Sequence, residues 1–160
     1  MVLARSRTVD AAPDAVWALV ADPAALPRWW PRTERVEGVT ERGWTVVLRS
    51  PRGRAVRADW RLEGQERARR RAWAQQIDGT PFARVLAERR VEARLEPAGS
   101  GTRVTLELRQ RGRRWARFGG WQLRRAARRE LDGALDGLSR AVPPPDDRGA
   151  PPPHDRGPRP

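Results

Sequence analysis

The residues that enzymes most often use for acid–base catalysis are almost missing from this sequence. Histidine occurs once, at His154, and lysine, tyrosine and cysteine do not occur. Within residues 1–142, proton transfer would therefore depend on aspartate or glutamate, and the serine and threonine hydroxyls lack a histidine to activate them. Alternation along the expected strands turns most carboxylates outward, Asp59 and Glu88 among them, so the sequence favours a binding site over a catalytic one. Without cysteine, disulfides and thiolate metal sites are excluded, and we predict neither a metal nor a cofactor.

Tryptophan is the residue type that points most clearly to a binding site. Trp44, Trp60 and Trp73, three of the eight tryptophans, fall on the expected inner face of three successive strands. Rigid aromatic walls suit a flat or polycyclic apolar ligand. The alternative is that these rings simply fill the core, which is the simpler reading for any one of them. For the set, we expect at least two to line a pocket.

Polar residues interrupt the apolar pattern at positions that should face inward. Strict alternation places Gln75, Arg89 and Gln110 on the inner face of the sheet. Arg124 falls on the apolar stripe of the last helix. A buried arginine needs an acceptor, so each arginine would contact a ligand, pair with a glutamate such as Glu107, or leave the core through a shift in register. Gln75 is the best candidate for a neutral group that orients a ligand.

The expected site combines the inner face of the sheet with the last helix. An early tryptophan pair, Trp29 and Trp30, is expected to act as a lid over it. The predicted ligand-binding residues are Trp44, Trp60, Trp73, Gln75, Arg89, Gln110, Gly120, Leu123, Arg124 and Ala127.

Basic residues gather between positions 111 and 129, which hold eight arginines and no acidic residue, within a chain of net charge +13. A GC-rich coding sequence explains why every basic residue is arginine, but it does not explain the excess charge. Such a cluster favours acidic lipid, nucleic acid, an anionic ligand or an acidic partner protein. The alternative is a solvated face, and no nucleic-acid motif accompanies the cluster. The predicted contact residues are Arg113, Arg117, Arg125 and Arg128.

Apolar periodicity predicts the elements that position these residues. A strand near 4–9 precedes a helix that residues 10–13 set up, with Pro13 at an early position, and a short turn over 24–27 leads to the tryptophan pair. Five stretches with period-two alternation and short turns between them then predict an antiparallel meander: 44–48, 56–62, 73–77, 85–95 and 104–108. The period changes to that of a helix from about Trp115 to Val142.

The chain is expected to form one domain over residues 1–142. Residues 143–160 are rich in proline and hold no large apolar residue, so we expect a disordered tail. No apolar run is long enough to span a bilayer, and a charge interrupts the first apolar run after three residues. We therefore expect a cytoplasmic protein.

Several short motifs follow the first strand: Ala12-Pro13-Asp14-Ala15-Val16-Trp17, Asp22-Pro23, and Leu26-Pro27-Arg28-Trp29-Trp30-Pro31. With the strands and the terminal helix, they resemble the START-like helix-grip superfamily (SRPBCC), particularly its polyketide cyclase/dehydrase-like members. The resemblance covers about residues 1–142 and rests on packing motifs that identify no chemistry. It implies an α+β helix-grip fold, in which a seven-stranded antiparallel sheet curls around a long C-terminal helix, with two short helices after strand one and a deep apolar cavity. Relatives bind lipids, sterols, plant hormones or polyketides, and some catalyse cyclisation or dehydration.

Three hypotheses of function follow. The first is binding or carriage of an apolar or amphipathic small molecule, lipid- or polyketide-like, in a tryptophan-lined cavity. The second is a cyclase/dehydrase enzyme that uses arginine and glutamine to position its substrate, or a buried carboxylate. The third is a basic adaptor for anionic lipid, nucleic acid or an acidic partner.

Overall fold

The computed structural model describes residues 1–50, 53–113 and 120–143. Its seven strands form one antiparallel sheet in the order β1-β7-β6-β5-β4-β3-β2. The strands are β1 (Val2–Val9), β2 (Thr33–Glu37), β3 (Gly43–Arg49), β4 (Ala55–Glu66), β5 (Arg70–Gln75), β6 (Leu86–Ala98) and β7 (Gly101–Gly112). The helices are α1 (Pro13–Ala21), α2 (Leu26–Trp29) and α3 (Gly120–Ala141), with short 3-10 turns η1 (Pro23–Ala25) and η2 (Pro81–Arg84).

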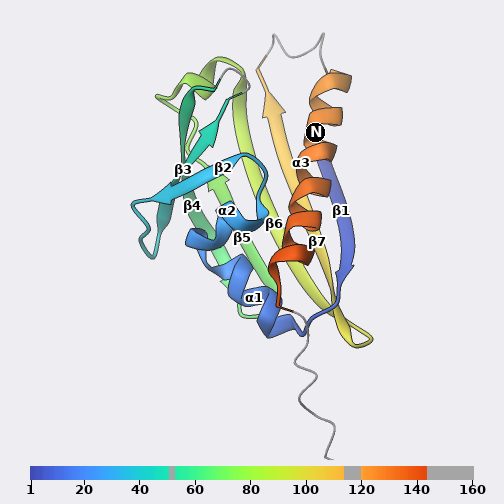
Figure 1. Cartoon of the computed structure of the whole chain (residues 1–160). Helices are drawn as coiled ribbons and strands as arrows, with labels where there is room; N and C mark the ends of the chain where they lie inside the picture. The colour runs from blue at the N-terminus through green and yellow to red at the C-terminus, as the bar shows by residue number, and fades with distance from the viewer. Residues whose placement is uncertain (51–52, 114–119, 144–160) are drawn as a thin grey trace, which may run out of the picture.

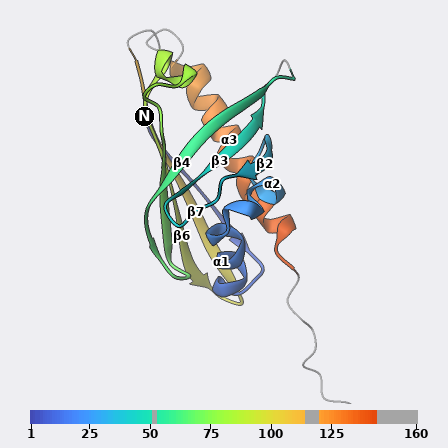
Figure 2. The ribbon, with the colours of Figure 1, turned by 90° about the vertical axis from the view of Figure 1, so that its left-hand side faces the viewer.

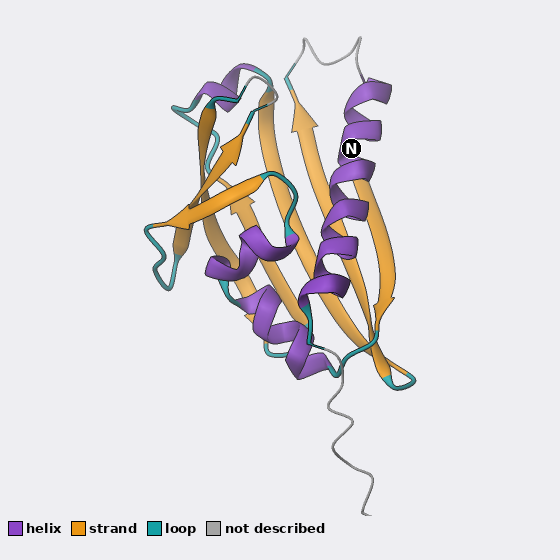
Figure 3. Cartoon of the chain, viewed as in Figure 1, coloured by secondary structure: helices purple, strands orange, loops and turns teal. Residues whose placement is uncertain are grey.

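All three α-helices lie on one face of the sheet, which curls around them (Figures 1, 2 and 3). The apolar stripe of α3 is buried in the same core as the inner residues of β6 and β7. The α+β helix-grip architecture expected from the sequence is therefore confirmed. The predicted proline-rich tail, 143–160, lies outside the described residues beyond position 143.

Two glycines of α3 let the short helix α2 approach it closely. A Cβ atom at Gly137 would overlap the backbone carbonyl of Trp29, and one at Gly133 would lie 2.9 Å from the Pro31 ring. A contact this close requires the missing side chains. The glycines therefore bring α2 and the residues that follow it against the middle of α3, where they border the candidate site described below.

Strand β2 was not found by apolar alternation and was expected only from the family resemblance. Its sequence, Thr-Glu-Arg-Val-Glu, holds a single apolar residue, Val36. The strand is short and lies at the edge of the sheet, where it pairs only with β3. Edge strands are often short and charged, so they leave a weak periodic signal.

The start of β6 departs from the expected alternation. Val85 was expected to face inward, but it is 56% exposed, and the neighbouring Leu86 is buried instead. The cause is the turn η2 together with a register shift between Leu86 and Glu88. Such a bulge places two residues of one strand opposite one of the next, which reverses the inward and outward positions.

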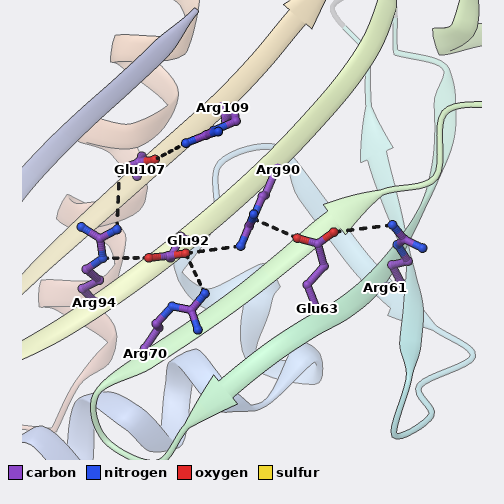
Figure 4. A network of polar contacts seen from close by, with 8 residues as sticks. All are labelled: Arg61, Glu63, Arg70, Arg90, Glu92, Arg94, Glu107 and Arg109. Atoms are coloured by element: carbon purple, nitrogen blue, oxygen red, sulfur yellow. Dashed lines mark hydrogen bonds and ion pairs between the residues drawn. The ribbon is translucent and has the colours of Figure 1, made fainter.

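The outer face of the sheet carries a network of ion pairs across β4, β5, β6 and β7 (Figure 4). Glu92 contacts Arg70 at 3.1 Å and Arg94 at 2.7 Å. Partial burial raises the pKa of Glu92, but hydrogen bonds from these two arginines outweigh it and leave the pKa below its ordinary value. The alternating Arg and Glu of this region are thus a self-paired, solvated face, as cross-strand pairing of opposite charges predicts.

Candidate ligand-binding site

A cavity of about 460 Å³ lies between the concave face of the sheet and helices α2 and α3. Its walls come from α2, β2, β3, β4, β5, η2, β6 and α3, together with the residues between α2 and β2 and Ser50 after β3. This volume falls in the range typical of small-molecule sites. Most of the wall is apolar, contributed by Leu26, Trp30, Val46, Leu48, Val56, Trp44, Trp60, Trp73 and Phe82.

Four tryptophans form most of the aromatic part of this wall. Trp44 and Trp60 lie directly opposite each other on β3 and β4. On β5, Gln75 lies opposite Trp60, and Trp73 lies two residues before Gln75, on the same face. Trp30 meets Trp73 edge to face, with ring centroids 6.2 Å apart. Alternation along three neighbouring strands gathers these rings, because residues that share a face of adjacent strands lie side by side.

Several polar side chains lie together in one part of the cavity wall. Glu130 of α3 accepts hydrogen bonds from the Arg89 guanidinium at 2.5 Å and from the Trp30 indole nitrogen at 3.1 Å. The Arg89 side chain is 19% exposed, and its guanidinium carbon lies 5.9 Å from the centre of the Trp60 ring. Arg89 therefore pairs with a glutamate, as one of the sequence-based alternatives stated, and it also borders the cavity, whereas its contact with a ligand stays a prediction. Its partner is Glu130, however, and the suggested Glu107 contacts arginines on the outer face.

Several buried polar atoms of the cavity wall have no hydrogen-bond partner in the described part of the protein. They are the indole nitrogen of Trp44, the amide nitrogen of Gln75, Nε of Arg89 and the hydroxyl oxygen of Thr33. Buried polar groups are ordinarily paired, because an unpaired one costs free energy. Three of these four atoms can only donate a hydrogen bond. These donors belong to residues of the wall but are covered by neighbouring atoms, so a side chain would have to shift before a guest oxygen could reach them.

The mouth of the cavity is lined by exposed arginines. Arg32, Arg49 and Arg129 belong to its wall and are exposed to solvent. Arg49 pairs with Glu34 at 2.9 Å. An apolar interior with a cationic rim is an amphipathic environment.

The structure does not bring every expected site residue to the cavity. Trp29 is buried in the core, with its ring edge-on to Trp30 at 5.4 Å. Gln110 and Ala127 are buried but do not border the cavity, Leu123 is half-buried, and Gly120 and Arg124 are exposed. The helix residues that do line the wall are Ala126, Arg129 and Glu130.

The physical reason for this difference lies in the geometry of α3. Its apolar stripe faces the sheet and fills the core, so the stripe itself has no access to a guest. The cavity borders the flank of that stripe, which carries Ala126 and Glu130. Sequence reasoning missed Glu130, although its position three residues after Ala127 and four before Ala134, both buried, was the available signal.

A second buried arginine, Arg71, was also missed. It lies two residues before Trp73, and so on the same face of β5. Its guanidinium donates to the carbonyl of Ala21 at the end of α1 and lies 5.4 Å from the centre of the Trp44 ring. Burial lowers the pKa of Arg71, partly offset by nearby Asp22. This side chain ties α1 to the sheet behind the aromatic wall.

The basic cluster is only partly described. Arg113, Arg125 and Arg128 are exposed, Arg113 lies 4.0 Å from Asp78, and Arg117 lies outside the described residues. Trp121, which is 64% exposed, lies three, four and seven positions before Arg124, Arg125 and Arg128. These spacings place all four on one face of α3.

The residues that the structure describes contain neither a metal-binding cluster nor a membrane-spanning helix. No group of three His, Cys, Asp or Glu side chains there could hold a metal ion. None of the helices in the same residues is long and apolar enough to cross a membrane.

Several solved structures are similar to this chain in fold. The protein TTHA0849 from Thermus thermophilus superposes with a TM-score of 0.72 at 19% identity, over 89% of this chain and 97% of that one. A START superfamily protein from Mycobacterium smegmatis gives a TM-score of 0.72 at 13% identity, over 88% and 96%. The di-domain ARO/CYC protein BexL from the BE-7585A biosynthetic pathway gives a TM-score of 0.72 at 25% identity, over 89% of this chain and 46% of BexL.

The sequence agrees with the fold at the level of the family. No curated protein matches it in a direct search. The sequence model of one family, described as polyketide cyclase / dehydrase and lipid transport, matches residues 2–143, nearly the whole described chain. The chain therefore belongs to the polyketide cyclase / dehydrase and lipid transport family.

Proposed function

We propose that this protein binds one apolar or amphipathic small molecule, lipid- or polyketide-like, whose oxygen atoms accept hydrogen bonds from the cavity wall. The observation that carries this proposal is a cavity whose wall is mostly aromatic and aliphatic, together with donors on Trp44, Gln75 and Arg89 that have no partner among the described residues and that small side-chain shifts could turn toward a guest. A pure hydrocarbon would leave these donors unsatisfied, whereas carbonyl or hydroxyl oxygens would pair with them. A cytoplasmic location remains a prediction from the sequence.

The expected affinity follows from the size of the cavity. A guest of about 20 non-hydrogen atoms that gains about 0.3 kcal/mol per atom would bind with about 6 kcal/mol, or a Kd of tens of micromolar. Better pairing with the three donors would lower the Kd further. Binding in this range is within reach of tryptophan fluorescence, because four rings border the cavity.

Substitution of single tryptophans tests the assignment. Trp60→Phe keeps most of the packing but removes part of the cavity wall, and it should weaken binding of a polycyclic ketone such as benzanthrone severalfold. Trp121→Phe is the matched control, because Trp121 is exposed and does not border the cavity. Equal affinities for both variants and the unaltered protein would refute the cavity as the binding site.

A second candidate function is a cyclase-type enzyme. The observation that favours it is the Arg89–Glu130 pair beside Gln75 in the cavity wall, in a family whose description includes polyketide cyclases. A guanidinium and an amide could hold a substrate carbonyl while the Glu130 carboxylate accepts a proton from carbon, as aldol cyclisation requires. BexL, an ARO/CYC protein, shares the fold.

Kinetics on a reactive polyketide analogue separate the two candidates. If the protein catalyses cyclisation, Glu130→Gln should abolish turnover while ligand binding persists, and Arg89→Gln should abolish turnover and also weaken binding. Arg124→Gln is the matched control, because Arg124 is an exposed arginine away from the cavity. Cyclisation at the uncatalysed rate in the presence of the unaltered protein would leave binding as the function.

For the basic cluster, we propose contact with an anionic lipid surface. The exposed Trp121 shares its face of α3 with Arg124, Arg125 and Arg128, and tryptophan beside cationic side chains suits the headgroup region of a bilayer. Vesicles with 30% phosphatidylglycerol should retain the protein at low salt, and Arg125→Glu with Arg128→Glu should release it. Retention by heparin but not by these vesicles would favour nucleic acid or another polyanion instead.

A further inference from the structure

The charges around the cavity are unbalanced. Four arginines line its wall, but only one carboxylate does: Arg32, Arg49, Arg89, Arg129 and Glu130. Arg89 pairs with Glu130 inside, and Arg49 pairs with Glu34 outside. In the described part of the chain, no carboxylate lies within 4.0 Å of the guanidinium groups of Arg32 or Arg129. Both residues are exposed, so two uncompensated cations flank the mouth.

Arg32 occupies its place at the expense of backbone strain. Its φ angle is 63°, in the left-handed region that glycine adopts without cost. The position is held by a hydrogen bond from the amide of Arg49 on β3 to the Arg32 carbonyl, 3.2 Å long. A second strained residue, Ala68 with φ of 55°, lies in the turn between β4 and β5, far along the chain and not in the cavity wall.

We propose that the natural ligand is an anionic amphiphile, whose carboxylate or phosphate group lies at the mouth between Arg32 and Arg129. This inference rests on the proposed function, because the apolar body of the ligand would occupy the tryptophan-lined interior. The donors of Trp44 and Gln75 would then meet oxygens farther along the molecule.

The chemistry of the arginines supports an orientation in which the anionic end of the ligand lies at the mouth. Guanidinium groups match carboxylate and phosphate oxygens in two-point hydrogen bonds, and they are stronger partners for these groups than for neutral oxygens. The apolar wall beside the mouth reduces screening by water, so the attraction within an ion pair there is stronger than within one on an open surface. The chain's net charge of +13 would also attract an anionic ligand from solution.

A pair of probes that differ only in charge tests the proposal. 1-Pyrenebutanoic acid and 1-pyrenebutanol share their ring and chain, and both can be followed by energy transfer from tryptophan. Two partly exposed ion pairs should make the acid bind about tenfold more tightly than the alcohol at low salt. The preference should fall at 0.5 M NaCl, where charges are screened, while the affinity for the alcohol stays the same.

Substitutions at the mouth locate the source of the preference. Arg32→Gln with Arg129→Gln should bring the affinity for the acid down to that of the alcohol, whose own affinity should not change. Arg103→Gln is the matched control, because Arg103 is also exposed and lies outside the cavity wall. Competition by dodecanoate and by dodecyl phosphate then decides whether a carboxylate or a phosphate fits better.

The strained backbone allows a sharper control. Arg32→Gly and Ala68→Gly both relieve a left-handed conformation, so both variants should melt at the same temperature as the unaltered protein or slightly above it. Only Arg32→Gly should lose part of the preference for the acid. A loss of preference in this variant therefore cannot be ascribed to unfolding.

The possible outcomes separate this inference from the proposed function. If the unaltered protein binds both probes equally, or if the double variant keeps the preference, the anionic end is refuted while the apolar cavity stands. If neither probe binds, the proposed function fails, and the inference fails with it. A tenfold preference that disappears in the double variant supports both.

Discussion

Arginine and glutamate occur both on the outer face of the sheet and in the cavity wall, but their charges are paired differently in the two places. On the outer face, Glu92 contacts Arg70, Arg90 and Arg94, so charges from neighbouring strands neutralise one another. In the cavity, Arg89 has one partner, Glu130, and its Nε atom has none among the described residues. An arginine-rich composition therefore says little about function by itself. The difference lies in whether the protein supplies the partner or leaves it to a ligand.

The largest effect should come from a change that disturbs the cavity wall through the backbone. Gly137→Ala places a Cβ atom on the backbone of Trp29, and relief requires α2 to move away from α3. We expect a loss of about 3 kcal/mol in the free energy of unfolding, as in overpacked cores. Chemical denaturation measures it, and ligand binding should weaken in parallel.

The control for this substitution is a glycine of β4, beside the ion pairs of the outer face. Gly64→Ala adds a Cβ atom that meets only the end of the Arg70 side chain, at 3.8 Å, so stability should change by less than about 0.5 kcal/mol. If Gly64→Ala cost as much as Gly137→Ala, the close packing of α2 on α3 would not be the cause.

A smaller effect is expected for the unpaired donor of Gln75. Gln75→Leu removes a buried amide whose nitrogen has no partner in the described part of the chain, so the ligand-free protein should become more stable by about 1 kcal/mol. The same change should weaken binding of a carbonyl-containing ligand about fivefold, because a hydrogen bond is lost. Thermal melting and fluorescence titration give the two quantities.

The exposed Gln65 of β4 serves as a comparison for Gln75. Gln65→Leu should leave ligand affinity unchanged. Destabilisation of the ligand-free protein by Gln75→Leu would mean that this amide is already satisfied, and the distinction between cavity and outer face would not hold at this residue.

The smallest effect concerns the ionisation of Glu92. Because its folded-state pKa lies below the ordinary value of 4.5, its stabilising contribution is complete above that value and is lost as the pH falls through the folded-state pKa. Glu92→Gln should therefore be less stable than the unaltered protein at pH 7, by under about 1 kcal/mol. In urea unfolding, the difference in stability between the two proteins should become smaller below pH 4.5. A difference that becomes larger would mean that the arginines do not stabilise the ionised form of Glu92.

The sequence predicted the elements better than it predicted the details of the site. Alternation identified Trp44, Trp60 and Trp73 as neighbours, because the side-chain period of a strand is fixed by its backbone. The bulge after Leu86 and the short edge strand β2 left no such signal. Both depend on how strands pair in space.

The helix side of the site shows the same limit. An amphipathic stripe indicates which face of α3 is buried, but the pairing of Glu130 with Arg89 depends on how the helix crosses the sheet. Arg124 lies on the predicted stripe and is nevertheless exposed, because burial on α3 begins only at Ala127. Periodicity predicts which face of a helix is buried, but not how much of its length packs against the sheet.

The central claim is that the tryptophan-lined cavity binds an apolar guest, and one titration tests it most directly. 1-Pyrenebutanol is added to the full chain while energy transfer from tryptophan to pyrene is measured, with Trp60→Phe and Trp121→Phe in parallel. We predict saturable binding of one probe per chain, weakened severalfold by Trp60→Phe and unchanged by Trp121→Phe. Transfer that never saturates, or that responds equally to both substitutions, would contradict the claim.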